Sequence, residues 1–287
     1  MNNSARYLIF FQYIGTAYRG VVKVPPQQQE VKGVQDHLEN AIRKLRPLTP
    51  VSLFISSRTD AGVHALSNSA HFDLVRTNDK PPFSEDVLVE ALNFHLGAEQ
   101  IRVTGARRVP DQFHARFQAQ SRTYVYRVAL GISHRSQLPL PECDLCWGVR
   151  HTVLDMEAMR DAAAMLVGTH DFSSFRAVNS DLPFKSPIKT MDVVGIQPGS
   201  SFVQAHFHRE ILFWELTFRS RSFLYKQVRR MAGALVAVGQ RRLSISHLKE
   251  ILEARDSLAF PQGLAAPAHG LFLTGVEYKD SDLQLKL

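Results

Sequence analysis

Cysteine is scarce in this sequence. Of 287 residues only two are cysteines, Cys143 and Cys146. Two cysteines cannot build the disulfide framework of a small secreted protein, and such scarcity is typical of a reducing compartment. We therefore expect an intracellular protein, either cytoplasmic or mitochondrial.

Long apolar runs are absent as well. No run approaches the roughly 20 apolar residues that a membrane helix needs, so the sequence predicts no membrane span. The first apolar run, residues 7–11, comes too early for a signal peptide to precede it. Arg6 is the only basic residue in that region, which argues against a transit peptide.

The sequence also lacks the motifs of several enzyme classes. It has no Gly-x-Gly-x-x-Gly and no phosphate-binding Gly-Lys-Ser/Thr, so we expect no dinucleotide or nucleotide phosphate site. Cys143-x-x-Cys146, with His134 and His151 nearby, suggests zinc. However, a closed structural zinc site needs four ligands, and no second Cys-x-x-Cys exists. We therefore expect neither a metal nor a cofactor.

Basic residues outnumber acidic ones. Lysine and arginine total 34 against 27 aspartates and glutamates, a formal net charge of +7. This excess favours a polyanionic partner such as nucleic acid, although solubility alone would also explain it. The hydrophobic fraction of 45% is ordinary for a folded soluble protein, and the length suits one large domain or two ordinary ones.

Hydrophobic periodicity predicts a regular order of elements in the first 110 residues. Apolar residues at helical spacing indicate helices, and β-branched or alternating runs indicate strands. Ser84 is a predicted N-cap. The predicted order is a strand at 6–13, a helix at 34–45, strands at 51–55 and 68–74, a helix at 85–95 and a strand at 101–109. This order suits an α+β layer with a largely antiparallel sheet.

The second part of the chain repeats this mixture. Asp155 and Ser246 are predicted helix N-caps, and residues 169–187 are predicted to form a long loop. We expect strands at 122–130, 188–196, 211–219 and 271–278, and helices at 156–167, 224–238 and 247–252. The sequence thus predicts an α+β fold of two similar halves, residues 1–110 and 111–287, whose mostly antiparallel sheets meet along a cleft.

One polar stretch, Ser56 to His64, lies between the predicted strands 51–55 and 68–74. Asp60 and Gly62 are therefore expected on a loop, where a rigid scaffold can present a side chain. An Asp-x-Gly by itself is usually only a turn. The full string from Arg58, Arg-Thr-Asp-Ala-Gly-Val-His, carries more information than that.

This string resembles, without a gap, the active-site loop of the TruA-type tRNA pseudouridine synthases. Further resemblances follow in family order between residues 6 and 278. They are the segments 113–117, Tyr124-x-Tyr126, 168–175, 223–231 and 268–273. The resemblance implies the pseudouridine synthase fold with a basic, catalytic cleft, a tRNA substrate, and catalysis without cofactor or metal. Because relatives are often dimers, a homodimer is a further expectation.

The resemblance assigns Asp60 as the essential carboxylate. It implies that Arg229 forms an ion pair with Asp60 and that Tyr124 stacks against the target uracil. From spacing alone, Arg229 would be a solvated charge on a helix and Tyr124 a core aromatic residue.

Arg58 is expected to bind an RNA phosphate or to hold the flipped nucleotide. His64 and Arg116 are the other expected substrate-binding residues, although His64 could instead simply hydrogen-bond within the loop. The basic residues expected to face RNA are Arg76, Lys80, Arg102, Arg107, Arg108, Arg116, Arg122, Lys226, Arg229, Arg230, Arg241 and Arg242.

Two other functions are consistent with parts of the pattern. A non-catalytic RNA-binding protein could retain this fold, but the complete set of Arg58, Asp60, Tyr124 and Arg229 argues against it. A hydrolase would need a second catalytic acid near Asp60, and the loop supplies none. The sequence therefore favours an isomerase that converts uridine to pseudouridine.

Overall fold

The computed structural model describes residues 4–23, 31–77, 80–178, 186–201, 203 and 210–285. The chain divides into two compact units, Met1–Arg122 with Leu273–Leu287, and Thr123–Phe272. The first boundary falls within strand β5 (Ser121–Leu130) and the second within β10 (Leu271–Glu277). The final residues of the chain thus belong with its beginning.

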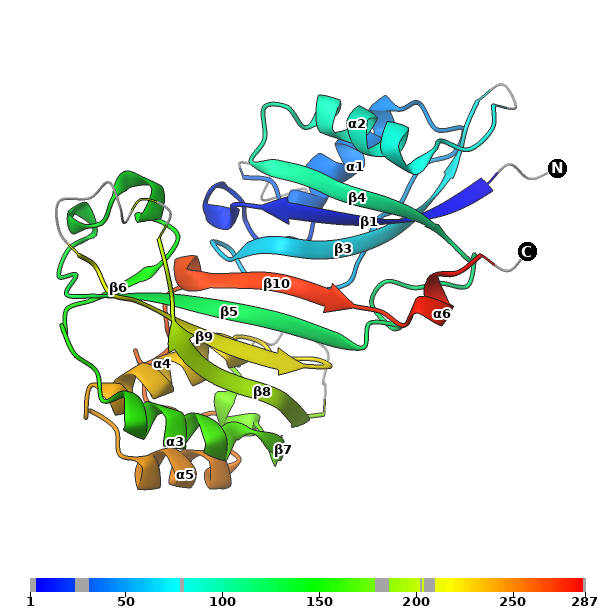
Figure 1. Cartoon of the computed structure of the whole chain (residues 1–287). Helices are drawn as coiled ribbons and strands as arrows, with labels where there is room; N and C mark the ends of the chain where they lie inside the picture. Colours follow the sequence, from blue (N-terminus) through cyan, green and yellow to red (C-terminus); the bar gives the residue numbers. More distant parts are fainter. Residues whose placement is uncertain are drawn as a thin grey trace. The chain divides into compact units, whose positions relative to one another are not determined.

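The first unit is a mostly antiparallel sheet with two main helices (Figure 1). Its strands run in the order β4-β1-β3-β10, with the short β2 paired to β3, and β1 is antiparallel to both of its neighbours. The elements are β1 (Ser4–Tyr13), α1 (Val34–Lys44), β2 (Phe54–Ile55), β3 (His64–Val75), α2 (Glu85–His95), β4 (Ile101–Val109), β10 and the one-turn α6 (Asp280–Leu283).

Apolar periodicity explains these elements. On α1, Val34, Leu38, Ala41 and Ile42 are buried at helical spacing, which confirms the predicted amphipathic helix. Most of β1 is buried, in keeping with a strand inside the sheet. The predicted order of six elements in residues 1–110 is confirmed, but β2 is shorter than the predicted strand at 51–55.

The second unit contains the strand order β5-β9-β8-β7, with β6 parallel to β5. Strand β8 is antiparallel to both β7 and β9. Helix α4 is buried along nearly its whole length, and α3 packs on α4, α5 and β8. Its elements are β5, β6 (Trp147–Val149), α3 (Met156–Leu166), β7 (Gly168–Asp171), β8 (Ile188–Pro198), β9 (Phe213–Ser220), α4 (Gln227–Gly239) and α5 (Ile245–Ala254).

Two local predictions were wrong here. The N-cap of α5 is Ser244, whose Oγ accepts the backbone N–H of His247 at 3.1 Å, whereas Ser246 lies inside the helix. The predicted loop at 169–187 begins with strand β7, and part of it, residues 179–185, lies outside the described residues. Asp155 does cap α3, through the N–H of Ala158 at 3.1 Å.

The prediction of a mixed α and β fold with mostly antiparallel strands is confirmed. Within the described ranges, no helix has the length and apolar character needed to cross a bilayer.

Candidate active site

The loop that carries Asp60 connects β2 to β3 in the first unit. The carbonyl of Asp60 accepts the N–H of Val63 at 3.2 Å, and Gly62 between them has a φ of +76°. A positive φ at the third position of such a turn favours glycine. The turn leaves Asp60 half-buried and Arg58 exposed. Asp60 is therefore held on a fixed backbone.

A second segment, residues 15–21, packs directly behind this loop. The N–H of Val21 donates to the carbonyl of Thr59 at 3.2 Å. A Cβ on Gly20, whose φ is +86°, would lie 2.8 Å from that same carbonyl oxygen, and a Cβ on Gly15 would lie 2.0 Å from the carbonyl oxygen of Val63. Only glycine permits the two backbones to approach so closely.

Buried hydrogen bonds hold the loop from the side of the sheet. The hydroxyls of Tyr13 and Thr59 are 2.7 Å apart, and Asn68 Nδ2 donates to the carbonyl of Ser57 at 3.1 Å. Ser56 Oγ donates to Asn68 Oδ1 at 3.0 Å. Burial raises the pKa of Tyr13 to about 12, so its hydroxyl stays protonated. These bonds fix the loop where it leaves β2.

Arg122 also belongs to this network. Its Nε donates to Ser57 Oγ at 3.2 Å, and its Nη2 donates to the carbonyls of Ser56 at 3.1 Å and Arg116 at 2.9 Å. The residue is only 8% exposed. The expectation that Arg122 faces RNA is therefore wrong. The planar guanidinium instead ties the Asp60 loop to the segment around Arg116.

The other two expected residues of this unit differ in exposure. His64 is fully buried at the start of β3, and its Nδ1 accepts the N–H of Gly15 at 2.9 Å. Arg116 is half-buried, with its guanidinium 5.7 Å from the centre of the Phe117 ring. The first unit thus gathers Arg58, Asp60, His64 and Arg116 around one supported loop. Their contact with substrate stays a prediction.

Tyr124 and Arg229 belong to the second unit. Tyr124, on β5, is buried, and its ring meets that of Phe223 edge-on at 5.1 Å. Arg229, on α4, is half-buried, and its Nε donates to the carbonyl of Ala266 at 2.8 Å. Arg229 is therefore not merely a solvated charge, as spacing alone would suggest. Its pairing with Asp60 stays a prediction.

The neighbouring Arg230 has a different environment. Its Nη1 donates to the carbonyls of Ser174 at 2.8 Å and Arg176 at 2.9 Å. Its guanidinium also lies 4.7 Å from the centre of the Phe260 ring. Burial lowers the pKa of Arg230. Adjacent arginines that look equivalent in the sequence thus differ, and Arg230 serves the packing of the second unit.

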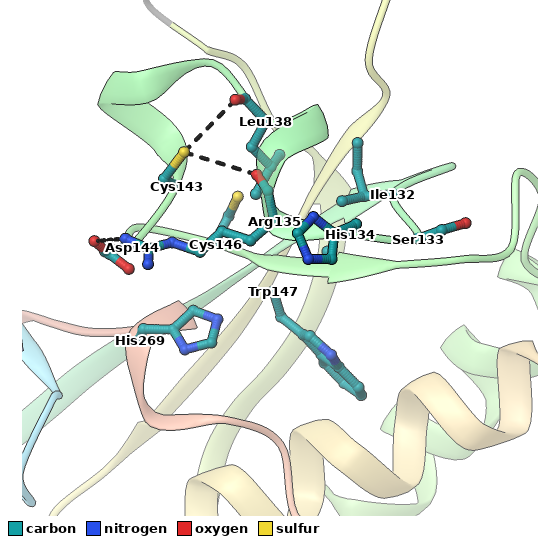
Figure 2. A pocket seen from close by; sticks show the side chains of 11 residues that line it. Ile132, Ser133, His134, Arg135, Leu138, Cys143, Asp144, Cys146, Trp147 and His269 are labelled. Carbon is teal, nitrogen blue, oxygen red and sulfur yellow. Dashed lines mark hydrogen bonds and ion pairs between the residues drawn. The ribbon is translucent and has the colours of Figure 1, made fainter.

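A cavity of about 190 Å³ in the second unit contains both cysteines (Figure 2). Cys146 is fully buried, its thiol donates to the carbonyl of Glu142 at 3.4 Å, and burial raises its pKa to about 12. Such a thiol is a poor metal ligand and a poor nucleophile. Across the described part of the chain, no group of three or more His, Cys, Asp or Glu side chains is placed to hold a metal ion.

Known proteins are similar to this chain over most of its length. A family model described as tRNA pseudouridine synthase matches residues 9–118 and 162–279. The tRNA pseudouridine synthase-like 1 of Xenopus laevis is 53% identical over 98% of this chain and 94% of its own length. The Homo sapiens protein of that name is 51% identical, over 96% and 90%.

Bacterial proteins are similar as well. The tRNA pseudouridine synthase A of Paramagnetospirillum magneticum is 38% identical over 96% of this chain and 96% of its own. The similarity thus covers almost the full length of both chains. This chain therefore belongs to the TruA family of tRNA pseudouridine synthases.

Proposed function

We propose that this protein isomerises specific uridines of tRNA to pseudouridine, with Asp60 as the essential carboxylate. The observation that carries the proposal is the loop from Arg58 to His64. It has the complete family motif, and it presents a half-buried carboxylate on a backbone fixed by hydrogen bonds on two sides. A loop held so firmly can keep a reactive group in place without reorganisation during the reaction.

The reaction needs little beyond such a carboxylate. The bond from uracil N1 to C1′ breaks, the base turns, and C5 bonds to C1′. C5 loses its proton and N1 gains one, so atoms and electrons balance without a redox partner. Asp60 could attack C1′ or uracil C6, or stabilise charge while a 2′ proton is removed. All three routes require an ionised carboxylate.

Other residues are proposed to serve the same reaction. A uridine stacked in RNA must leave the stack to be modified, and the exposed Arg58 is suited to hold the extruded nucleotide through a phosphate. Arg229 would favour the ionised form of Asp60, and Tyr124 would stack against the uracil. Arg116 would bind the RNA backbone. His64 contributes through its buried bond to Gly15, which supports the loop.

Product analysis tests the proposal. An unmodified tRNA transcript is incubated with the wild type or with Asp60→Ala, digested to nucleosides and separated by chromatography. We expect pseudouridine from the wild type alone. Equal amounts from both proteins would exclude Asp60 as the essential group. RNA binding without pseudouridine from the wild type would favour a binding protein that retained the fold.

A further inference from the structure

Beside the catalytic loop, aromatic and imidazole rings of the first unit form a continuous row. Phe54 stacks on His71 with ring centres 4.9 Å apart and an interplanar angle of 16°. His71 lies 4.6 Å from His114, and His114 lies 4.3 Å from Phe117. We call these four residues, Phe54, His71, His114 and Phe117, the aromatic platform.

The two ends of the aromatic platform face solvent. Phe54 is 48% exposed and Phe117 is 67% exposed, whereas His71 between them is only 2% exposed. Large aromatic side chains that are exposed together in one place usually mark a binding surface. Stacking on an exposed ring face would remove apolar area from water.

Hydrogen bonds hold the rings in place. His71 Nδ1 accepts the N–H of Ala115 at 3.1 Å, and His114 Nδ1 accepts the N–H of Arg116 at 3.2 Å. Burial lowers the pKa of His71 to about 4, and it also lowers the pKa of His114. Neutral imidazoles can stack beside Arg116 without repelling it. The two imidazole rings are thus fixed before anything binds.

The platform is joined to the catalytic loop by covalent and hydrogen bonds. Phe54 precedes Asp60 by six residues, which span at most about 20 Å. Arg122 bridges the carbonyls of Ser56 on that loop and Arg116 on the platform segment. A nucleotide stacked on the platform would therefore be only a few nucleotides from one placed at Asp60.

The chemistry of this surface favours RNA over an apolar protein partner. Exposed aromatic rings accompanied by arginine are how proteins bind unpaired bases, the ring stacking on the base and the cation meeting the backbone. Here the Arg116 guanidinium lies 5.7 Å from the centre of the Phe117 ring. The net charge of +7 suits the same partner.

We propose that the aromatic platform stacks an unpaired base of the substrate RNA near the target uridine, while Arg116 binds an adjacent phosphate. This rests on the proposed function for the choice of RNA as ligand and for the target uridine. The platform would position the strand and raise affinity, and it would take no part in the bond changes at uracil.

Leucine variants test the proposal, because leucine keeps apolar volume and loses the flat ring. The dissociation constant of a fluorescently labelled tRNA transcript is measured for wild type, Phe54→Leu and Phe117→Leu. We expect each variant to bind at least fivefold more weakly, with a matching rise in KM for pseudouridine formation and unchanged kcat. Phe117→Trp should restore affinity. Phe94→Leu is the control, since Phe94 is 81% exposed on α2 and is not one of the four platform residues.

Wild-type affinity in both leucine variants would overturn the proposal. So would a change of oligomeric state in sedimentation without a change in RNA affinity, because the surface would then be a protein interface. Absence of RNA binding by the wild type would overturn it as well. If the wild type binds the transcript but makes no pseudouridine, and the leucine variants bind it more weakly, the platform stands and the proposed isomerase activity fails.

Discussion

Single residues decide whether the Asp60 loop can adopt its conformation. Gly15 has an ordinary backbone conformation, but a Cβ there would lie 2.0 Å from the carbonyl oxygen of Val63. Gly105, on β4, has no neighbouring atom within 4 Å of the same position. The two glycines therefore differ in the space available for a Cβ, and comparing them isolates the steric effect of an added methyl group.

We expect Gly15→Ala to lower the free energy of unfolding by about 1–3 kcal/mol, the usual cost of overpacking, and to displace the loop. Gly105→Ala should be close to neutral. Denaturant unfolding measures the loss of stability, and kcat for pseudouridine formation measures the effect of displacing the loop. Equal stability and equal kcat in both variants would show that Gly15 is not needed for packing against Val63.

His71 should make stability depend on pH. Burial is the main cause that lowers its pKa to about 4 from an ordinary value near 6.5. The unfolded chain therefore binds more protons than the folded chain between these values. The contribution of His71 to the free energy of unfolding is fully present above about pH 6.5 and is lost as the pH falls toward 4.

We expect His71→Asn, which keeps an acceptor for the N–H of Ala115, to lose less stability over this range than the wild type does. The measurement is the melting temperature at pH 7 and at pH 5. The same drop in both proteins would show that His71 is not a source of the pH dependence.

Helix α4 carries two adjacent arginines with different surroundings, and the difference can be measured. Arg230→Gln removes a donor to the carbonyls of Ser174 and Arg176, so it should lower the melting temperature and leave kcat unchanged. Arg229→Gln should instead lower kcat strongly. Circular dichroism melting combined with kinetics of the folded protein distinguishes them. A loss of kcat in Arg230→Gln equal to that in Arg229→Gln would contradict this assignment.

Strand β5 contributes Arg122 to the support of the Asp60 loop. Removing a buried guanidinium leaves its acceptors, Ser57 Oγ and the carbonyls of Ser56 and Arg116, without these bonds. We expect Arg122→Ala to lower the free energy of unfolding by about 3 kcal/mol and to reduce kcat.

Arg122→Lys, which keeps charge but not the fork of donors, should be intermediate. Arg107→Gln, an exposed arginine on β4, is the control and should change stability by less than about 0.5 kcal/mol. If Arg122→Ala and Arg107→Gln were equally stable, the buried bonds would contribute nothing measurable.

At the scale of the whole molecule, periodicity and caps predicted most elements. Long amphipathic segments such as α1 have a stripe that defines them locally. The four-residue β7 was missed because a strand so short has no periodicity to detect. The N-cap of α5 was assigned to Ser246 instead of Ser244 because the two serines offer equivalent hydroxyls in the sequence. Nothing local to residues 273–287 indicates that they belong with the first unit.

The candidate site was predictable only where residues are contiguous. The string around Asp60 is a motif, so it could be found directly. The support of the loop could not be, because Tyr13, Asn68 and Arg122 come from distant parts of the chain and meet through folding alone. Arg122 in particular has the charge that is typical of an RNA-binding residue, but the fold buries it.

The most direct test of the central claim is tritium release from C5-tritiated uridine in an unmodified tRNA transcript, measured for wild type and Asp60→Asn. This variant keeps the size of the side chain and removes its charge, and transcript binding measured alongside serves as the folding control. The account predicts release by the wild type and none by Asp60→Asn, with similar transcript affinity in both. Equal release by both proteins would contradict it.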